Sequence, residues 1–212
     1  GGSLVDRFGN NGLLGASFYL KTKKNWVMGM EGGYLFGNKV KEDGVLDNLK
    51  TEQGFIINSA GTPSETKLNE RGYLVSIKAG RIFPVLPFTE VKLGKNPNSG
   101  IMLVCGPGFL QHKIHIVSDA PQLGGDYKKG YDRLSYGAAV SAFLGYLFLS
   151  NKRLLNFYFG LDYVQAWTKN RRGYNYDTMQ YDTAKRTDIM TGVKAGWILP
   201  LYKKVPDEFY YN

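Results

Sequence analysis

The sequence predicts an all-β fold: a closed antiparallel transmembrane barrel of eight strands, with short turns on one side of the membrane and long loops on the other. Alternating segments, composition and connector lengths all point to it. Glycine accounts for 27 of 212 residues, and the aromatic residues are 15 Tyr, 12 Phe and 3 Trp. Glycine weakens helix interiors and aromatic residues favour strands, so the composition disfavours both a helical bundle and disorder. The mean hydropathy of −0.29 excludes a protein of many transmembrane helices, but a barrel hides its apolar residues in alternation.

Five segments alternate cleanly with a period of two. In residues 156–168, for example, Phe157 and Phe159 share one face and Asp162 lies on the other. Large apolar side chains occupy one face of these segments, while glycine, serine and single charges occupy the other. The five segments are residues 26–36, 73–79, 134–151, 156–168 and 188–199. The run 134–151 has no charge or proline and is barely long enough for a transmembrane helix, but its large and small residues separate as in a strand.

Two further segments, residues 13–20 and 101–116, are less regular, and Pro107 is expected to lie at a rim or a bulge. Bacterial single-chain barrels have an even number of strands, so seven strands require an eighth. Residues 1–10 and 87–93 are the two candidates, and the pattern does not choose between them. The last strand is expected at about 185–201, followed by a periplasmic tail, residues 202–212; the whole chain, 1–212, forms one domain.

Connector lengths alternate, as they do in barrels with short periplasmic turns and long extracellular loops. Residues 21–25 and 150–153 are short connectors, and residues 38–71, 117–133 and 169–186 are long ones. The first long loop carries six acidic and five basic residues, a balance that suits folding on itself or on a partner.

A soluble lipocalin-like barrel would also show alternating strands, with its apolar face inward. Glycine has no reason to dominate a solvent-facing strand surface, whereas it lets a narrow lumen close. The apolar face also carries aromatic residues toward the strand ends, as interfacial girdles do. These residues are Trp26, Tyr34, Phe36, Tyr146, Phe148, Trp167 and Trp197. The pattern therefore favours a membrane barrel.

The net charge of +9 comes from short basic clusters between apolar stretches, so it does not indicate nucleic-acid binding. The clusters are either solvated loops or contacts to phosphates of lipid headgroups, such as those of outer-membrane lipid and lipopolysaccharide. The single cysteine, Cys105, cannot form an intrachain disulfide. The first residues lack a signal-peptide pattern, which fits either a cytosolic protein or a mature form whose signal peptide was removed. The predicted membrane-spanning strands favour a mature form whose signal peptide was removed. The expected location is therefore the cell outer membrane.

Four charged residues fall on the predicted inner faces: Glu31, Lys78, Asp162 and Lys194. Buried charges must be paired, so two acids and two bases predict an ion-pair network that plugs the lumen. An ion or proton pathway is the alternative, but the lumen of so small a barrel is normally filled by side chains.

Catalysis has little support in the sequence. The two histidines, His112 and His115, lie near Ser118 and Asp119, but residues three apart in a strand point to opposite faces. They cannot readily share a metal or a substrate, so we expect no metal site, no cofactor and no enzyme. A lipid-acting outer-membrane enzyme, such as one that modifies lipid A, remains an alternative.

Two loop segments and the tail combine Tyr with Asp, Arg or Lys, the residue types of recognition surfaces. The same residues are also normal at any barrel rim. The candidate partner-binding residues are Asp126, Tyr127, Lys128, Lys129, Tyr131, Arg171, Arg172, Tyr174, Phe209, Tyr210 and Tyr211.

Several sequence segments resemble those of a family of small outer-membrane β-barrel proteins of the Bacteroidota. They are GNKVKEDGVLDNLKT, NPNSGI, LQHKI, GDYKKGYDRL, SNKRLLNFYFG, RRGYNYD and GWILPLYKKVPDEFYY. The resemblance implies an outer-membrane location and a removed signal peptide, and it supplies no active-site motif. It also implies an accessory role as an anchor or docking subunit of a multi-subunit envelope complex, most of all the type IX protein secretion system. An accessory role in outer-membrane protein assembly is the comparable alternative.

Overall fold

The structure, a computed structural model, describes residues 2–42, 44–84, 99–149 and 156–201. Seven long strands form one antiparallel sheet in the order β1-β2-β3-β4-β5-β6-β9. Their bounds are β1 Gly12–Lys21, β2 Trp26–Gly37, β3 Lys67–Phe83, β4 Gly100–Val117, β5 Ser135–Leu149, β6 Asn156–Asn170 and β9 Lys185–Trp197. The prediction of a mainly antiparallel β fold is confirmed. Strand β9 ends four residues before the expected 201.

The remaining elements are short. Helix α1 covers Gly2–Phe8, and β7 (Tyr174–Asn175) pairs with β8 (Gln180–Tyr181) as a small hairpin. Three 3-10 turns, η1 (Asp47–Leu49), η2 (Pro121–Leu123) and η3 (Tyr127–Gly130), lie in the long connectors. No helix in the described ranges is both long and apolar enough to cross a membrane.

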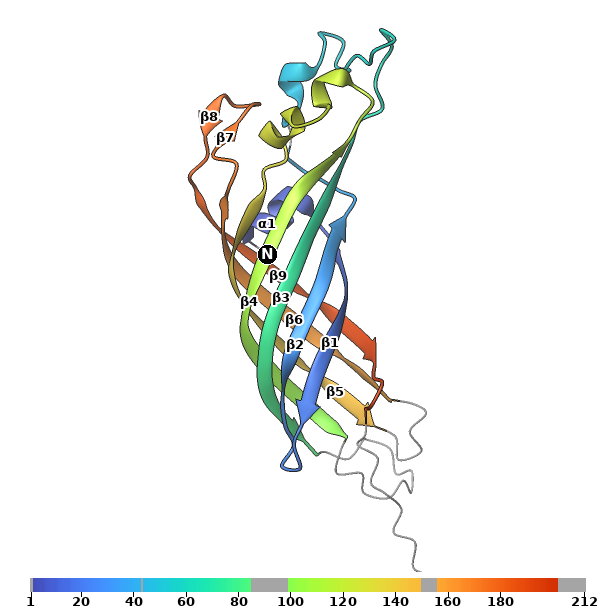
Figure 1. Ribbon diagram of the computed structural model, residues 1–212, viewed down its shortest axis with the longest axis vertical. Helices are drawn as coiled ribbons and strands as arrows, with labels where there is room; N and C mark the ends of the chain where they lie inside the picture. The colour runs from blue at the N-terminus through green and yellow to red at the C-terminus, as the bar shows by residue number, and fades with distance from the viewer. Residues whose placement is uncertain (1, 43, 85–98, 150–155, 202–212) are drawn as a thin grey trace, which may run out of the picture.

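The strands are tilted and strongly curved, and the long connectors gather at one end of the sheet (Figure 1). Residues 38–42, 44–66, 118–134 and 171–184 lie at this end, which we call the cap end. The β1–β2 turn lies at the other end, the hairpin end. Asn25 closes that turn with a positive φ of 63°, and the hydroxyl of Thr22 accepts a hydrogen bond from the Trp26 N–H at 3.1 Å.

The concave face of the sheet is filled by apolar side chains at two levels. Nearer the hairpin end the buried residues are Val27, Ile82, Met102, Val104, Phe143 and Leu147. Nearer the cap end they are Leu35, Leu74, Leu110, Ala139, Val164 and Ala166. Those from the segments 26–36, 73–79, 134–151 and 156–168 lie on the faces that the alternation predicts to point inward. The interior is packed rather than hollow.

Pro107 lies in the middle of β4, so its expected place at a rim or bulge is wrong. The β3–β4 ladder omits the pairs at Gly106 and Pro107, because proline has no N–H to donate. The register is the same on both sides of this interruption, from Ser76 opposite Gly108 to Ala79 opposite Cys105. No residue is therefore inserted, and the strand crosses the proline without a bulge.

The sheet is not closed within the described residues, because β1 and β9 are its two ends. The candidate eighth strand at residues 1–10 is wrong, since Gly2–Phe8 is helical. Leu4, Arg7 and Phe8 are all buried, a spacing of three and four residues that puts them on one face of a helix. Gly9, at φ +69°, ends α1 by donating its N–H to the Val5 carbonyl at 2.9 Å. The other candidate, residues 87–93, lies outside the described residues.

Candidate functional site

The convex face of the sheet exposes large apolar side chains along its strands. Nine apolar residues on this face are each between a third and four fifths exposed. They are Met28, Met30, Val75, Ile77, Leu103, Val140, Leu144, Leu161 and Val193. Charged residues of the mid-strand regions point instead to the concave side. This arrangement is the reverse of a water-soluble barrel and matches a surface that faces hydrocarbon.

Aromatic residues flank this apolar face near both ends of the strands. Toward the cap end, the Tyr34 and Tyr73 rings lie 5.3 Å apart. Toward the hairpin end, Phe148 stacks on Phe157 at 5.1 Å, and Trp26 and Trp197 are more than half exposed. Such paired belts are typical of the two interfaces of a membrane.

The structure brings the four predicted lumen charges together inside the sheet. Lys78 Nζ lies 3.0 Å from Glu31 Oε2 and 3.4 Å from Asp162 Oδ1. Lys194 pairs with the same two acids, and the Tyr19 hydroxyl donates to Glu31 at 3.3 Å. The Lys78 side chain is 1% exposed. Each base therefore bridges both acids, in a network that joins β1, β2, β3, β6 and β9 across the interior.

A second polar cluster, which the sequence analysis missed, lies closer to the cap end. His112 Nε2 is 3.0 Å from Asp188 Oδ2, and Thr168 Oγ1 donates to the same oxygen at 2.5 Å. All three residues are buried, and the Phe8 ring of α1 packs edge-on against His112 at 5.4 Å. Asp188 stands at an inward position of its alternating segment, and this parity was the signal that could have found it.

The two histidines lie on opposite faces, as the alternation predicts: His112 is buried and His115 is exposed. Ser118 and Asp119 join a different arrangement, in which Ser118 Oγ lies 3.0 Å from Ser64 Oγ. The part of the chain that the structure describes contains no cluster of His, Cys, Asp and Glu that could hold a metal ion.

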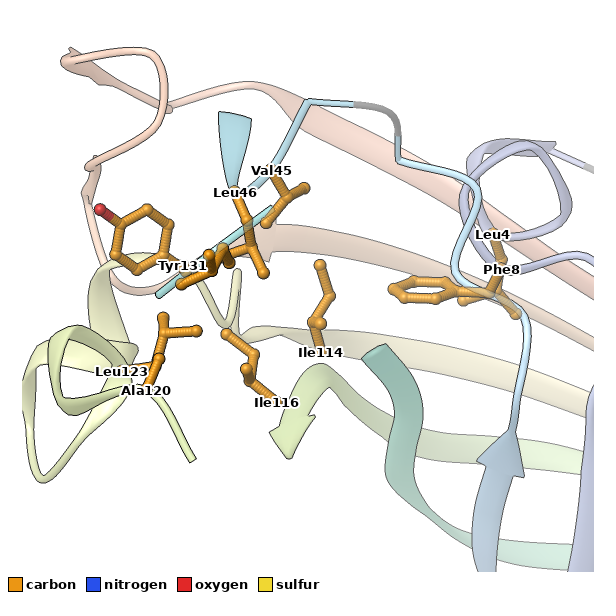
Figure 2. Packing of buried hydrophobic residues seen from close by; sticks show 10 residues of the cluster. Leu4, Phe8, Val45, Leu46, Ile114, Ile116, Ala120, Leu123 and Tyr131 are labelled. Atoms are coloured by element: carbon orange, nitrogen blue, oxygen red, sulfur yellow. The ribbon is translucent and has the colours of Figure 1, made fainter. Parts of the chain in front are cut away.

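The long connectors fold into a cap with a hydrophobic core (Figure 2). Its buried residues come from α1, from each of the first two connectors and from the end of β4, and Tyr176 of the third connector packs against them. They are Leu4, Phe8, Val45, Leu46, Ile56, Ile114, Ile116, Ala120, Leu123 and Tyr131. The balanced charge of the first connector suits this folding, and the cap is continuous with the interior of the sheet.

Ion pairs bind the three connectors and α1 to one another. Glu42 accepts from Arg7 of α1 and from Arg133 at 2.9 Å, and Arg133 also reaches Asp177 at 2.5 Å. Arg172 holds Asp132 with two hydrogen bonds of 2.8 and 2.5 Å. All three of these arginines therefore connect residues more than thirty positions apart in sequence, and they fix how the connectors sit over the sheet.

Asp182 anchors the β7–β8 hairpin to the start of β9. Its carboxylate accepts hydrogen bonds from Arg186 at 2.6 Å, Asn170 at 3.1 Å and the Ala184 N–H at 3.2 Å. Burial opposes ionisation, but these hydrogen bonds and the Arg186 charge outweigh it and lower the pKa of Asp182 to about 2.

The predicted partner-binding residues divide into several groups. Asp126, Tyr127, Lys128, Lys129 and Arg171 are exposed, and Tyr174 is half-buried. Tyr131 is wholly buried, because its ring is part of the cap core, so it is not a surface residue. Arg172 forms an ion pair with Asp132 of this chain. Phe209, Tyr210 and Tyr211 lie outside the described residues.

The exposed aromatic surface of the cap centres on the third connector. Tyr127 contacts Tyr176 at 5.1 Å, and Tyr174 contacts Tyr181 at 5.1 Å between ring centroids. Tyr127, Met179 and Tyr181 are each more than half exposed. We call Tyr127, Tyr174, Met179 and Tyr181 the cap aromatic patch; it is held on a folded support rather than on free loops.

No family model, no curated protein and no solved structure matches this chain.

Proposed function

We propose that this protein is an integral outer-membrane β-barrel that serves, without catalysis, as an anchor or docking subunit of a larger envelope complex. The observation that carries the membrane location is the reversed polarity of the sheet, which is apolar and exposed outside, and charged and paired inside. A hydrocarbon environment makes such an exterior favourable. In this orientation the cap end is extracellular and the hairpin end is periplasmic.

The docking role rests on two observations: the interior is filled, and the cap exposes a patch of tyrosines. Side chains and ion pairs fill the interior, which argues against a transport channel. The cap, by contrast, presents an ordered patch of tyrosines with exposed Lys128 and Lys129 beside it. Tyrosine-rich rigid surfaces are suited to protein partners. The resemblance to Bacteroidota barrels makes the type IX secretion machinery our first candidate complex and the outer-membrane assembly machinery the second.

Tryptophan fluorescence tests the membrane location directly. All three tryptophans, Trp26, Trp167 and Trp197, are on the convex face and 51 to 66% exposed. In vesicles of phosphatidylcholine with brominated acyl chains, most of the fluorescence should be quenched, and water-soluble acrylamide should quench little. Strong quenching by acrylamide and none by brominated lipid would contradict the membrane location.

Purification of the protein from its native membrane in mild detergent tests docking. We expect a stoichiometric envelope protein to accompany it, and substitution of Tyr127 and Tyr181 by alanine to reduce that recovery if the cap is the contact. Recovery of a monomer without a partner would refute the docking role and favour the alternative of a lipid-acting enzyme.

A further inference from the structure

The convex face of the sheet carries bases but no acids. Within the seven long strands the acidic residues are Glu31, Glu70, Asp162 and Asp188, and all four lie on the concave side. The basic residues on the convex side are Lys67, Arg71, Arg81, Lys113, Lys169 and Lys185. All of these except Arg81 lie in the part of their strand nearer the cap end. The positive charge of the convex face is therefore concentrated at one end.

Two pairs of like charges lie directly opposite each other on the strand ladder at the cap end. Arg71 of β3 is opposite Lys113 of β4. Lys169 of β6 is opposite Lys185 of β9. Like charges at directly opposite positions destabilise a sheet, because their side chains project from neighbouring points of the same face. An anion that lies between the two members of a pair would relieve this repulsion.

A fifth base lies beside the second pair. Arg171 directly follows β6, and its guanidinium carbon lies 4.3 Å from the centre of the Tyr136 ring. Tyr136 is itself opposite Lys169 on the ladder between β5 and β6. We call the five bases the basic belt: Arg71, Lys113, Lys169, Arg171 and Lys185. Each of them is exposed or half-buried, so each is accessible to a ligand.

The belt is not neutralised by ion pairs within the described ranges. Arg71 Nη1 donates to the carbonyl oxygens of Gly37 at 3.1 Å and Glu70 at 2.7 Å, which holds the guanidinium in place without a carboxylate. The ion pairs between described residues include no belt residue. The exposed Lys50 and Lys129, by contrast, each lie 2.6 Å from an acidic partner. The belt therefore presents a net positive charge on the outside of the sheet.

The belt borders the face that we propose to lie in hydrocarbon. One row of directly opposite residues crosses the sheet from Tyr34 through Tyr73, Gln111 and Tyr136 to Lys169. Tyrosines on the outside of a membrane protein are enriched at the depth of the lipid headgroups. The bases at the end of this row and next to it are therefore at the depth of lipid phosphates.

We propose that the basic belt binds the phosphate groups of anionic lipid in the leaflet at the cap end. This inference rests on the proposed membrane location and adds a ligand to it. Phosphate oxygens accept charge-assisted hydrogen bonds from guanidinium and ammonium groups, and one phosphate can lie between two opposite bases. A lipid fits this position better than an acidic protein does, because the convex face next to the belt is aromatic and apolar.

Selective quenching of one tryptophan tests the proposal. Trp167 lies two residues before Lys169 on the same face of β6, whereas Trp197 ends β9 at the hairpin end. Variants that keep one of these tryptophans, with phenylalanine in place of the others, are reconstituted in phosphatidylcholine vesicles. The probe is a minor share of phosphatidic acid with brominated acyl chains. It should quench Trp167 more strongly than the same share of brominated phosphatidylcholine does.

Removal of two belt charges should abolish this preference. The double substitution K169Q/K185Q should lower the binding constant of phosphatidic acid relative to phosphatidylcholine at Trp167 by about fivefold for each base removed. The relative constant at Trp197 should not change. The matched control, K50Q/K129Q, removes two charges that already have acidic partners and should alter neither constant. In pure phosphatidylcholine, urea titration should show no loss of stability in K169Q/K185Q, because the two lysines repel each other.

Several outcomes would overturn the lipid site. Equal quenching of Trp167 by the two brominated lipids, or an unchanged preference in K169Q/K185Q, would overturn the belt while leaving the membrane location intact. Displacement of the brominated phosphatidic acid by inorganic phosphate would assign the belt to free phosphate. In native membranes, coupling of Lys113 or Lys185 to a protein by carbodiimide, which joins carboxylates to amines, would assign it to an acidic protein. Absence of quenching by either lipid would overturn the membrane location itself.

Discussion

At the scale of single residues, the interior charges show how a small set of side chains can join distant strands. Lys78 is fully enclosed and bridges Glu31 of β2 and Asp162 of β6, so its removal leaves two acids with a single base, Lys194, in a low-dielectric interior. Breaking a buried ion pair by deleting one partner is far more costly than the pair's net contribution to stability. The network therefore acts mainly as a constraint on which strands can face one another.

Replacement of Lys78 by methionine, K78M, should lower the free energy of unfolding by about 3–5 kcal/mol, because the two buried carboxylates lose one of their two bases and keep only Lys194. Urea titration of the protein folded in vesicles, followed by tryptophan fluorescence, measures the change. The matched control is K50M, since Lys50 pairs with Asp47 at 2.6 Å but both side chains are exposed. The control should cost less than about 1 kcal/mol. Equal effects of the two substitutions would contradict a buried network.

At the scale of elements, the strands could be predicted from the sequence and the cap could not. Alternate residues of a strand face two different environments and therefore differ in size and polarity. Phe157, Gly160 and Asp162 were sufficient to assign β6 and its inward face. Connectors have no such period. Their structure depends on contacts between segments, such as Tyr131 against Leu46 and Leu123, whose sequence positions carry no common pattern.

The same limit explains the errors at α1 and Pro107. Seven residues are too few for a reliable helical period, and α1 is stabilised by packing of Leu4 and Phe8 in the cap core. The position of Pro107 depends on the ladder to β3, a partner that sequence alone does not identify. The inward charges were predictable because parity places them on one face. Their pairing distances depend on the curvature of the sheet.

Tyr131→Ala should unfold the cap while leaving the sheet intact, because Tyr131 is the largest wholly buried side chain among the described residues and lies in the cap core. A cavity of this size costs about 3 kcal/mol or more, which a small substructure cannot absorb. Limited proteolysis should then cut within residues 38–66 and 118–134. Tyr127→Ala is the control, since its ring is 53% exposed, and it should leave the cap resistant. Global unfolding of Tyr131→Ala would show that the cap and the sheet fold as one unit.

Acid should loosen the β7–β8 hairpin through Asp182. The folded-state pKa of about 2 is below the ordinary value of 3.8, so the stabilisation is complete above pH of roughly 4 and is lost as the pH falls toward 2. Amide hydrogen exchange of residues 174–184, measured at about pH 5, 3 and 2, reports the loss of this stabilisation. Asp182→Asn should exchange faster at pH 5 and show much less pH dependence. Unchanged protection of the wild-type hairpin at the lowest pH would refute this role.

At the scale of the whole molecule, the proposed membrane location would give each surface a matching environment. Hydrocarbon would cover the exposed apolar residues of the convex face, the inward charges pair with one another, and water would solvate the cap with its ion pairs. The composition excess of glycine fits the same picture, because a Cβ at Gly160 or Gly137 would fall within 2.5 Å of backbone atoms of the neighbouring strand. Glycine at these inward positions lets the strands curve tightly around the packed interior.

This polarity predicts opposite outcomes for one substitution at two equally exposed sites. Leu161 on the convex face is 62% exposed and Met179 on the cap is 64% exposed. In water, arginine would be tolerated at both. In a bilayer, Leu161→Arg places a charge in hydrocarbon and should cost about 2–4 kcal/mol near the midplane, whereas Met179→Arg should change stability by less than about 0.5 kcal/mol. Urea titration in vesicles measures both variants. Equal tolerance at Leu161 and Met179 would mean that water, and not lipid, covers the convex face.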